Sequence, residues 1–316
     1  MSTNNKTFQG EIEKHLIDFK TDYQYLPPTT KKRWFYHDFV DNLFPPIKHG
    51  FLQYVYDSGM PLHDYVNHVR SSQIFCINTF FHLLAKEPTK LLDLLASKIS
   101  VKLKSIESYE FEFSADTNIL GEWKSDENRP EEYVTATDLF VIAKSENNEK
   151  YGFLIEVKFT EGDFTKRGGY NSNANKGELR KACNNGLELL SDFNSCYLQG
   201  ANKKSKLHRK YFDFFTKTDF KSIHFKNECP FKNNNQCLRN QSLLRAMIRE
   251  NKIDKGYFIL VHHDENSTII QEWNKYFNIV SSDSQKELLI IPASEFIAKS
   301  ADKNYKKYFA DRYRLK

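Results

Sequence analysis

Residues 135–161, TATDLFVIAKSENNEKYGFLIEVKFTE, hold two apolar runs that are each interrupted by charged residues. The linking SENNE contains the Asn and Ser residues that favour a turn, so the two runs are predicted to pair as a β-hairpin. If the turn centres on Asn147, opposing residue numbers sum to 294, and Asp138 faces Glu156. Opposed Cβ atoms lie about 4.5–5.5 Å apart, and the twofold alternation of a strand places Lys158 on the face of Glu156. A slip of one residue would separate the two carboxylates.

The charges of this hairpin require compensation. Both faces of the two runs are rich in large apolar residues, so the hairpin is predicted to be central in its sheet and largely covered. Two carboxylates in such a place repel each other, and burial of an ion costs several kcal/mol. Magnesium prefers one or two carboxylates together with waters and phosphate oxygens. We therefore predict that Asp138 and Glu156, with the carbonyl of Val157, bind Mg²⁺, for which Mn²⁺ would substitute.

Lys158 completes a set of groups suited to phosphate chemistry. A bound metal ion stabilises charge on a phosphate and lowers the pKa of a bound water. Beside it, Lys158 would orient or deprotonate the attacking water, or hold the phosphate as a point charge, and the residues alone do not choose between these roles. The alternative is an exposed hairpin on which Lys158 only pairs with Glu156.

The pattern along the chain predicts a mixed α/β (α+β) fold, with a central mixed β-sheet flanked by helices. Residues 1–65 are aromatic and contain two Pro-Pro pairs, which favour short helices and loops. Helical spacing of apolar residues begins at residue 66, and Thr89 is expected to cap a second helix. The predicted division is a helical N-terminal extension (1–65), a core (66–300) and a basic C-terminal helix (301–316). Further helices are expected at 178–193, 236–251 and 267–280, and strands at 105–115, 255–263 and 286–293.

The charged hairpin resembles that of the PD-(D/E)xK nuclease superfamily, which has an acidic residue on one core strand and Glu-x-Lys on the next, within an αβββαβ core. Asp138, Glu156 and Lys158 match this pattern, and Thr137 occupies the position where the superfamily often has Pro. The resemblance implies a restriction-endonuclease-like core. Glu112, on the preceding strand, is a lesser acidic candidate.

A narrower resemblance covers roughly residues 65–265. The stretches HVRSSQIFCINTF, EVKFTE and QCLRNQ are similar to those of bacterial proteins described as restriction endonucleases, in which a His-x-x-Ser-Ser-Gln helix precedes the catalytic hairpin. The resemblance implies further site residues. Gln73 and Glu161 become catalytic candidates, His68, Ser72 and Arg239 become nucleic-acid-binding candidates, and Gln236 lies with Arg239 on a supporting helix.

The resemblance implies a Mg²⁺-dependent nuclease that hydrolyses phosphodiester bonds, and most readily a DNA endonuclease of a restriction or phage-defence system. Two alternatives stay open: a non-catalytic nucleic-acid-binding module of the same fold, and a nuclease that acts on RNA. A homodimer is also expected, because cutting both strands at a symmetric site needs two active centres.

Basic residues suggest where a nucleic acid would lie. The chain has 46 Lys and Arg against 41 Asp and Glu, a net charge of +5 that permits a polyanionic partner without requiring one. The loop 162–176 directly follows the second charged strand, so Lys166 and Arg167, with Asn173, are candidates for reading DNA. Basic segments at 31–35, 202–210 and 303–314, the last with Tyr305, Tyr308 and Tyr313, would follow a nucleic-acid backbone or form solvated surface.

The remaining signals concern location and cysteines. The first residues, MSTNNKTFQG, do not resemble a secretory signal, and no apolar run reaches the length of a membrane span, so a cytoplasmic protein without membrane contact is expected. Five cysteines without a CxxC pair fit a reducing compartment. Cys76 is expected in the core, whereas the spacing of Cys183, Cys196, Cys229 and Cys237 leaves open whether they bind a metal.

Overall fold

A mixed five-stranded β-sheet organises the protein. The computed structural model describes residues 3–24, 33–123, 134–164, 178–197, 199–201 and 208–315. Within these residues the strand order is β1-β2-β3-β6-β7. The pairs β1–β2 and β2–β3 are antiparallel, whereas β3–β6 and β6–β7 are parallel. The strands are β1 (Leu103–Phe113), β2 (Thr137–Ser145), β3 (Lys150–Lys158), β6 (Lys255–His262) and β7 (Leu288–Pro292).

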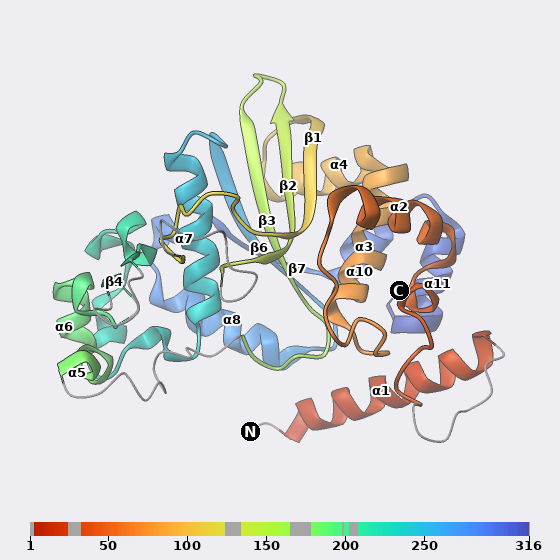
Figure 1. Cartoon of the computed structure of the whole chain (residues 1–316), viewed down its shortest axis with the longest axis horizontal. Helices are drawn as coiled ribbons and strands as arrows, with labels where there is room; N and C mark the ends of the chain where they lie inside the picture. The colour runs from red at the N-terminus through yellow and green to blue at the C-terminus, as the bar shows by residue number, and fades with distance from the viewer. Residues whose placement is uncertain are drawn as a thin grey trace.

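Helices cover both faces of this sheet, which confirms the predicted fold class. Figure 1 shows α3, α10 and α11 on one side of the sheet and α7 on the other. The helices are α1 (Thr3–Gln24), α2 (Lys48–Ser58), α3 (Ser72–Lys86), α4 (Pro88–Ile99), α5 (Glu178–Asn184), α6 (Gly186–Ser191), α7 (Asn235–Arg249), α8 (Ser267–Ile279), α9 (Ser282–Gln285), α10 (Ala293–Lys299) and α11 (Lys303–Tyr313). Two short strands, β4 (Gly200–Ala201) and β5 (His208–Arg209), pair apart from the main sheet.

Two hydrophobic cores lie on the two faces of the sheet. The first, the α3 core, joins Val141 and Ile155 to Phe75 and other residues of α3. The second, the α7 core, joins Phe140 and Leu154 to residues of α7. Because side chains alternate along a strand, odd-numbered residues of β2 and β3 enter the α3 core and even-numbered residues face α7. Asp138, Glu156 and Lys158 therefore belong to the α7 side of the hairpin.

The predicted hairpin register is confirmed. The paired residues run from Leu139↔Ile155 to Lys144↔Lys150, and each pair sums to 294. Asn148 in the connecting turn has a φ of 63°, the left-handed conformation that Asn adopts more readily than most residues. Local turn chemistry and strand alternation are thus sufficient to align these two strands.

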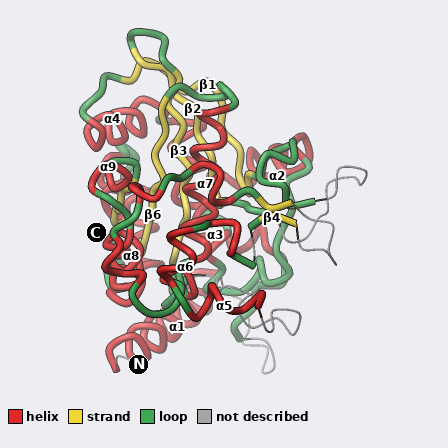
Figure 2. The backbone as a smooth tube through the Cα atoms, turned by 90° about the vertical axis from the view of Figure 1, so that its left-hand side faces the viewer, coloured by secondary structure: helices red, strands yellow, loops and turns green. Residues whose placement is uncertain are grey.

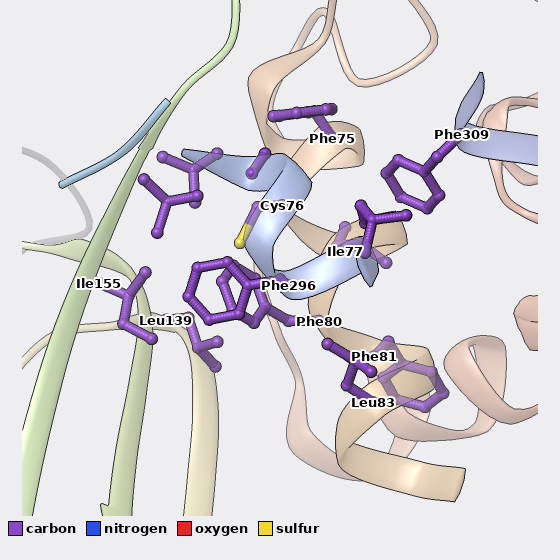
Figure 3. Close-up of a cluster of buried hydrophobic side chains, with 14 of the residues drawn as sticks. Phe75, Cys76, Ile77, Phe80, Phe81, Leu83, Leu139, Ile155, Phe296 and Phe309 are labelled. Atoms are coloured by element: carbon purple, nitrogen blue, oxygen red, sulfur yellow. The ribbon is translucent and has the colours of Figure 1, made fainter. Parts of the chain in front are cut away.

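Helix α3 is buried along almost its whole length. Its N-terminus is capped by Ser71, whose side chain accepts a hydrogen bond from the Ile74 N–H. Cys76 is buried in the α3 core as predicted (Figure 3). The expected cap of α4 at Thr89 is wrong, because Glu87 is the N-cap and Pro88 occupies the first helical position. Pro is favoured there, since its missing N–H would have no helical partner.

The N-terminal segment forms a longer helix than expected. Instead of short helices and loops, it begins with the 22-residue helix α1. Phe8, Ile12, Leu16 and Phe19 recur at helical spacing on one face and join the α3 core. Figures 1 and 2 both place α1 at the end of the molecule opposite the β2–β3 turn.

The C-terminal helix α11 is also part of the α3 core. Tyr305, Tyr308 and Tyr313 are buried there, so the interpretation that they interleave with basic residues along a nucleic acid is wrong. Arg312 is buried as well, and its guanidinium donates hydrogen bonds to the carbonyl of Asn42 (2.8 Å) and to the Tyr308 hydroxyl. Aromatic residues three to four positions apart face the core, and the lysines lie outside.

Helical structure in the segment 178–193 is interrupted. Two short helices, α5 and α6, replace the one expected, and Asn185 between them caps α6 by accepting from the Glu188 N–H.

In the part of the chain that the structure describes, no helix has both the length and the apolar character to cross a membrane.

Candidate active site

Asp138 lies where β2 and β3 separate. The backbone ladder between these strands ends at Leu139↔Ile155, and side chains provide the next bonds. The Thr137 hydroxyl donates to the Ile155 carbonyl (2.8 Å), and the Val157 N–H donates to Asp138 Oδ2 (2.6 Å). The Asp138 carboxylate is therefore held against β3, one position beyond the last pair and beside Glu156.

Glu156 is buried, and several side chains donate hydrogen bonds to its carboxylate. Its side chain is only 4% exposed and that of Lys158 11%, so the alternative of an exposed hairpin is excluded. Lys158 Nζ lies 2.9 Å from Glu156 Oε1. Gln236 Nε2 donates to the same oxygen (2.7 Å), and Asn240 Nδ2 donates to Oε2 (3.2 Å). Gln236 and Asn240 are one turn apart on α7, so a single helix face holds this carboxylate.

The charges of the three hairpin residues affect one another. Burial raises the pKa of Asp138 well above its usual value, and repulsion from Glu156 and Glu112 raises it further. Burial alone would lower the pKa of Lys158, but attraction to Glu156, Glu161 and Asp138 outweighs burial and raises it. Lys158 is therefore a stable ammonium ion in this arrangement.

Glu112 adds a third carboxylate from β1. The pairs Phe111↔Leu139 and Phe113↔Thr137 place it beside Asp138. Its φ of 52° is in the left-handed region, which is uncommon for a non-glycine residue and stores strain. Residues two apart on a regular strand face the same side of the sheet. The conformation of Glu112 breaks this alternation, so Phe111 enters the α3 core and Phe113 enters the α7 core.

Gln73 and His63 bind the Glu112 carboxylate. Gln73 Nε2 donates to Glu112 Oε1 (2.9 Å), and the Gln73 side-chain oxygen accepts from the His63 N–H (3.0 Å). The His63 ring lies 3.1 Å from Glu112 Oε2. The hydrogen bond to Glu112 raises the pKa of His63 although its partial burial opposes this. Gln73, a predicted catalytic residue, thus contacts Glu112 and not the Asp138–Glu156 pair directly.

A cleft opens at the end of β3. Its volume is about 690 Å³, and it brings together three residues that the sequence singles out: His68, Ser72 and Glu161. Glu161 Oε2 accepts from the Phe159 N–H (2.9 Å) and the Thr160 N–H (3.0 Å), which fixes it in the turn after β3. Burial lowers the pKa of His68, and the nearby Arg70 lowers it further. The other lining residues are Gln9, Phe35, His63, Tyr65, Arg70, Ser71 and Thr160.

Arg239 lies on α7 away from this cleft. Its guanidinium donates to the Thr135 hydroxyl (2.9 Å) and forms an ion pair with Glu122 (3.3 Å). Glu122 is buried and also accepts from the Tyr211 hydroxyl (2.7 Å). These contacts connect the loop before β2 to α7. The DNA-binding role of Arg239 stays a prediction.

Several predicted nucleic-acid contacts lie outside the described residues. These are Lys166, Arg167 and Asn173, together with residues 31–32 and 202–207 of the basic segments.

The donor set at the hairpin fits a hard divalent cation in its chemistry. Across the described ranges, no group of three or more His, Cys, Asp and Glu side chains is placed to hold a metal ion. Magnesium needs only one or two protein carboxylates, because waters and phosphate complete its coordination. Asp138 and Glu156 are adjacent carboxylates with an excess of negative charge, so they suit such an ion. The Val157 carbonyl stays a predicted ligand.

Sequence reasoning missed three residues of this region: His63, Asn240 and Glu122. Asn240 had a usable signal, because it lies one helical turn from Gln236 on the same α7 face. His63 and Glu122 had none, since their partners Glu112 and Arg239 are distant in sequence.

Comparison with known proteins identifies a protein family. The model of the protein family described as "Restriction Endonuclease associating with ARP" matches residues 14–314. This range extends beyond residues 65–265 into both terminal helices. No curated protein and no solved structure matches the chain.

Proposed function

Because this chain belongs to the family of restriction endonucleases associating with ARP, we propose that it is a Mg²⁺-dependent nuclease that cuts DNA internally, as part of a restriction or phage-defence system. One observation carries the proposal beyond the family: Asp138, Glu156 and Lys158 lie together at the open end of a buried hairpin. Association with an ARP component and dimerisation are further parts of the proposal.

The residues of the proposed site divide three tasks among them. Asp138 and Glu156, with the Val157 carbonyl, would hold the ion, which when bound stabilises charge on the scissile phosphate and generates hydroxide from water. Gln236 and Asn240 orient the Glu156 carboxylate from α7. The raised pKa of Lys158 keeps its amine protonated. Lys158 is therefore better suited to hold a phosphate oxygen as a point charge than to act as a base.

The test is cleavage of plasmid, linear duplex, single-stranded DNA and RNA with and without Mg²⁺. Asp138→Asn, Glu156→Gln and Lys158→Met should each reduce cleavage by roughly 10³-fold, the effect of losing about 4 kcal/mol of transition-state stabilisation. Glu146→Gln is the matched control, because Glu146 lies exposed near the hairpin turn and should leave the rate unchanged.

Two results would contradict the proposal. If the wild-type protein cuts none of the four substrates, it is not a nuclease. If the three variants cut as fast as the wild type, the assigned site is wrong. Preferential cutting of RNA would retain the site and change the substrate.

A further inference from the structure

The cleft beside the hairpin has the size and position of a ligand site. Protein pockets for small ligands usually measure about 300–1,000 Å³, and this cleft measures about 690 Å³. One wall is formed by Thr160 and Glu161, which follow Lys158 in the chain, and the other by residues 63–72 before and at the start of α3. A ligand in the cleft would therefore lie at the end of the strand that carries Glu156 and Lys158.

Aromatic rings form one part of the cleft wall. Tyr65 is 70% exposed, which is unusual for a large ring inside a concave surface. Its ring centre lies 6.4 Å from that of Phe35, and the His68 ring meets Phe35 edge-on at 4.9 Å. A ring exposed in this way offers a flat apolar face to a planar group. A nucleobase is such a group, and stacking on aromatic side chains is the usual way in which proteins bind unpaired bases.

The position of this aromatic wall is set by backbone contacts. The Tyr36 N–H donates to the Asn67 carbonyl (2.9 Å), and the Val69 N–H donates to the Trp34 carbonyl (2.8 Å). Phe35 and His68 form an antiparallel bridge between these bonds. The N-terminal segment therefore holds Phe35 at a fixed place, and the wall is preformed.

The opposite wall is also fixed. Gln9 of α1 donates to the Thr160 carbonyl, and Glu161 is held by two backbone N–H groups. Two basic side chains in the cleft lining have acidic partners: Arg70 pairs with Glu13, and the half-exposed His63 binds Glu112. The rest of the polar lining is Gln9, His68, Ser71, Ser72, Thr160 and Glu161. The two basic side chains suit a nucleotide whose phosphate lies toward His63 and whose base lies toward Tyr65.

We propose that this cleft binds one unpaired nucleotide of the nucleic acid, with its base stacked on Tyr65 beside Phe35. The substrate would accordingly contain single-stranded or locally unpaired DNA next to the scissile bond. This inference rests on the proposed function, because it names the substrate class of the same site.

The test measures binding without cleavage. The full-length wild-type protein in EDTA is titrated into a single-stranded oligodeoxynucleotide that contains 2-aminopurine, and into the same sequence as a duplex. The single strand should bind more tightly and its fluorescence should be quenched by stacking. Tyr65→Ala should weaken single-strand binding by roughly 5- to 150-fold, whereas Tyr65→Phe should retain it.

Tyr56→Ala is the matched control. Tyr56 is 85% exposed on α2 and does not line the cleft, so its removal should not change affinity. Melting temperatures of all variants check that folding is intact. Because Tyr65 is largely exposed, its replacement should leave the fold unchanged.

The outcomes separate this inference from the proposed function. Cleavage by the wild type together with unchanged single-strand binding by Tyr65→Ala would overturn the inference and leave the nuclease intact. Tyr65-dependent binding without any metal-dependent cleavage would overturn the nuclease and leave the nucleotide site. Equal binding of duplex and single strand without fluorescence quenching also overturns the inference.

Discussion

The Asp138 carboxylate lies between two others, Glu112 on β1 and Glu156 on β3. Each neighbour raises the free energy of its charged form, and burial adds to that cost. Lys158 balances only part of this charge. Under the proposed function, Asp138 is therefore a residue at which activity and stability oppose each other.

Asp138→Asn should make the metal-free protein more stable. A carboxyl whose folded pKa is raised destabilises the fold at pH values above that pKa, and the cost disappears below its ordinary pKa of 3.8. The variant should thus melt a few degrees higher than the wild type at about pH 8, and the difference should shrink as the pH falls toward about 4. Differential scanning fluorimetry in EDTA measures this. A lower melting temperature for the variant at pH 8 would contradict the electrostatic account.

His63→Asn should lower stability at acidic pH, whereas Asp138→Asn should raise it at alkaline pH. The pKa of His63 is raised chiefly by the hydrogen bond to Glu112, so the contribution of this pair is complete below the ordinary histidine pKa of 6.5 and is lost as the pH rises through the folded pKa. The variant should melt below the wild type at about pH 5.5 and equally at about pH 9. His49→Asn, an exposed histidine on α2, serves as the control. A constant difference across this range would argue against the pair.

At the scale of elements, α7 is positioned by close contact with the sheet. Gly152 of β3 and Gly256 of β6 are register partners. A Cβ at Gly256 would lie 2.4 Å from Leu244 Cδ1 of α7, and one at Gly152 would lie 2.5 Å from Ile253 Cδ1. Gly256 therefore lets α7 approach the strands, whereas Gly152 makes room for Ile253 in the segment after α7. The same helix carries Gln236 and Asn240 to Glu156.

Gly256→Ala should therefore destabilise the protein by about 1–3 kcal/mol, the usual cost of overpacking a core. It should also reduce cleavage, because α7 must move away from Glu156. Urea denaturation and the plasmid assay measure the two effects. Gly10→Ala is the control, since nothing lies within 4 Å of its added Cβ in α1. A neutral Gly256→Ala would show that Leu244 can move aside.

Elements differ in how far the sequence predicts them. The β2–β3 register was predictable, because the turn residues and the alternation lie within one short segment. The pairing of Gln73 and His63 with Glu112 was not, since it depends on a left-handed residue inside β1 that no glycine or Asn marks. The expectation at Thr89 was wrong because Pro88 occupies the first helical position, which moves the N-cap two residues earlier, to Glu87.

At the scale of the whole molecule, both ends of the chain join one core. Phe8 and Ile12 of α1 and Tyr305 and Phe309 of α11 belong to the α3 core together with the strands. The basic residues of 303–314 left open a nucleic-acid contact or a solvated surface, whereas the spacing of the aromatic residues there indicates a buried face. The two signals describe opposite faces of α11: burial of several aromatic rings stabilises the core, and the lysines stay solvated.

Arg312→Ala should destabilise the protein by about 2–4 kcal/mol. The change leaves the buried Asn42 carbonyl without its guanidinium donor and removes a cation packed among aromatic rings. Chemical denaturation followed by fluorescence measures the loss. Lys307→Ala, which removes an exposed ion pair with Asp311, should stay within about 0.5 kcal/mol. An Arg312→Ala effect as small as that of the control would contradict the account of this contact.

The hydrogen bond between Asn42 and Arg312 also means that the fold can be completed only after the C-terminal helix has been synthesised. The segment that carries Phe35 and Asn42 leaves the ribosome before the β2–β3 hairpin, and α11 emerges after both. Until α11 docks, the α3 core has an open side and the Asn42 carbonyl lacks its guanidinium donor. A polypeptide cut short before α11 would thus leave the α3 core incomplete, so under the proposed function a truncated chain would not be a working nuclease.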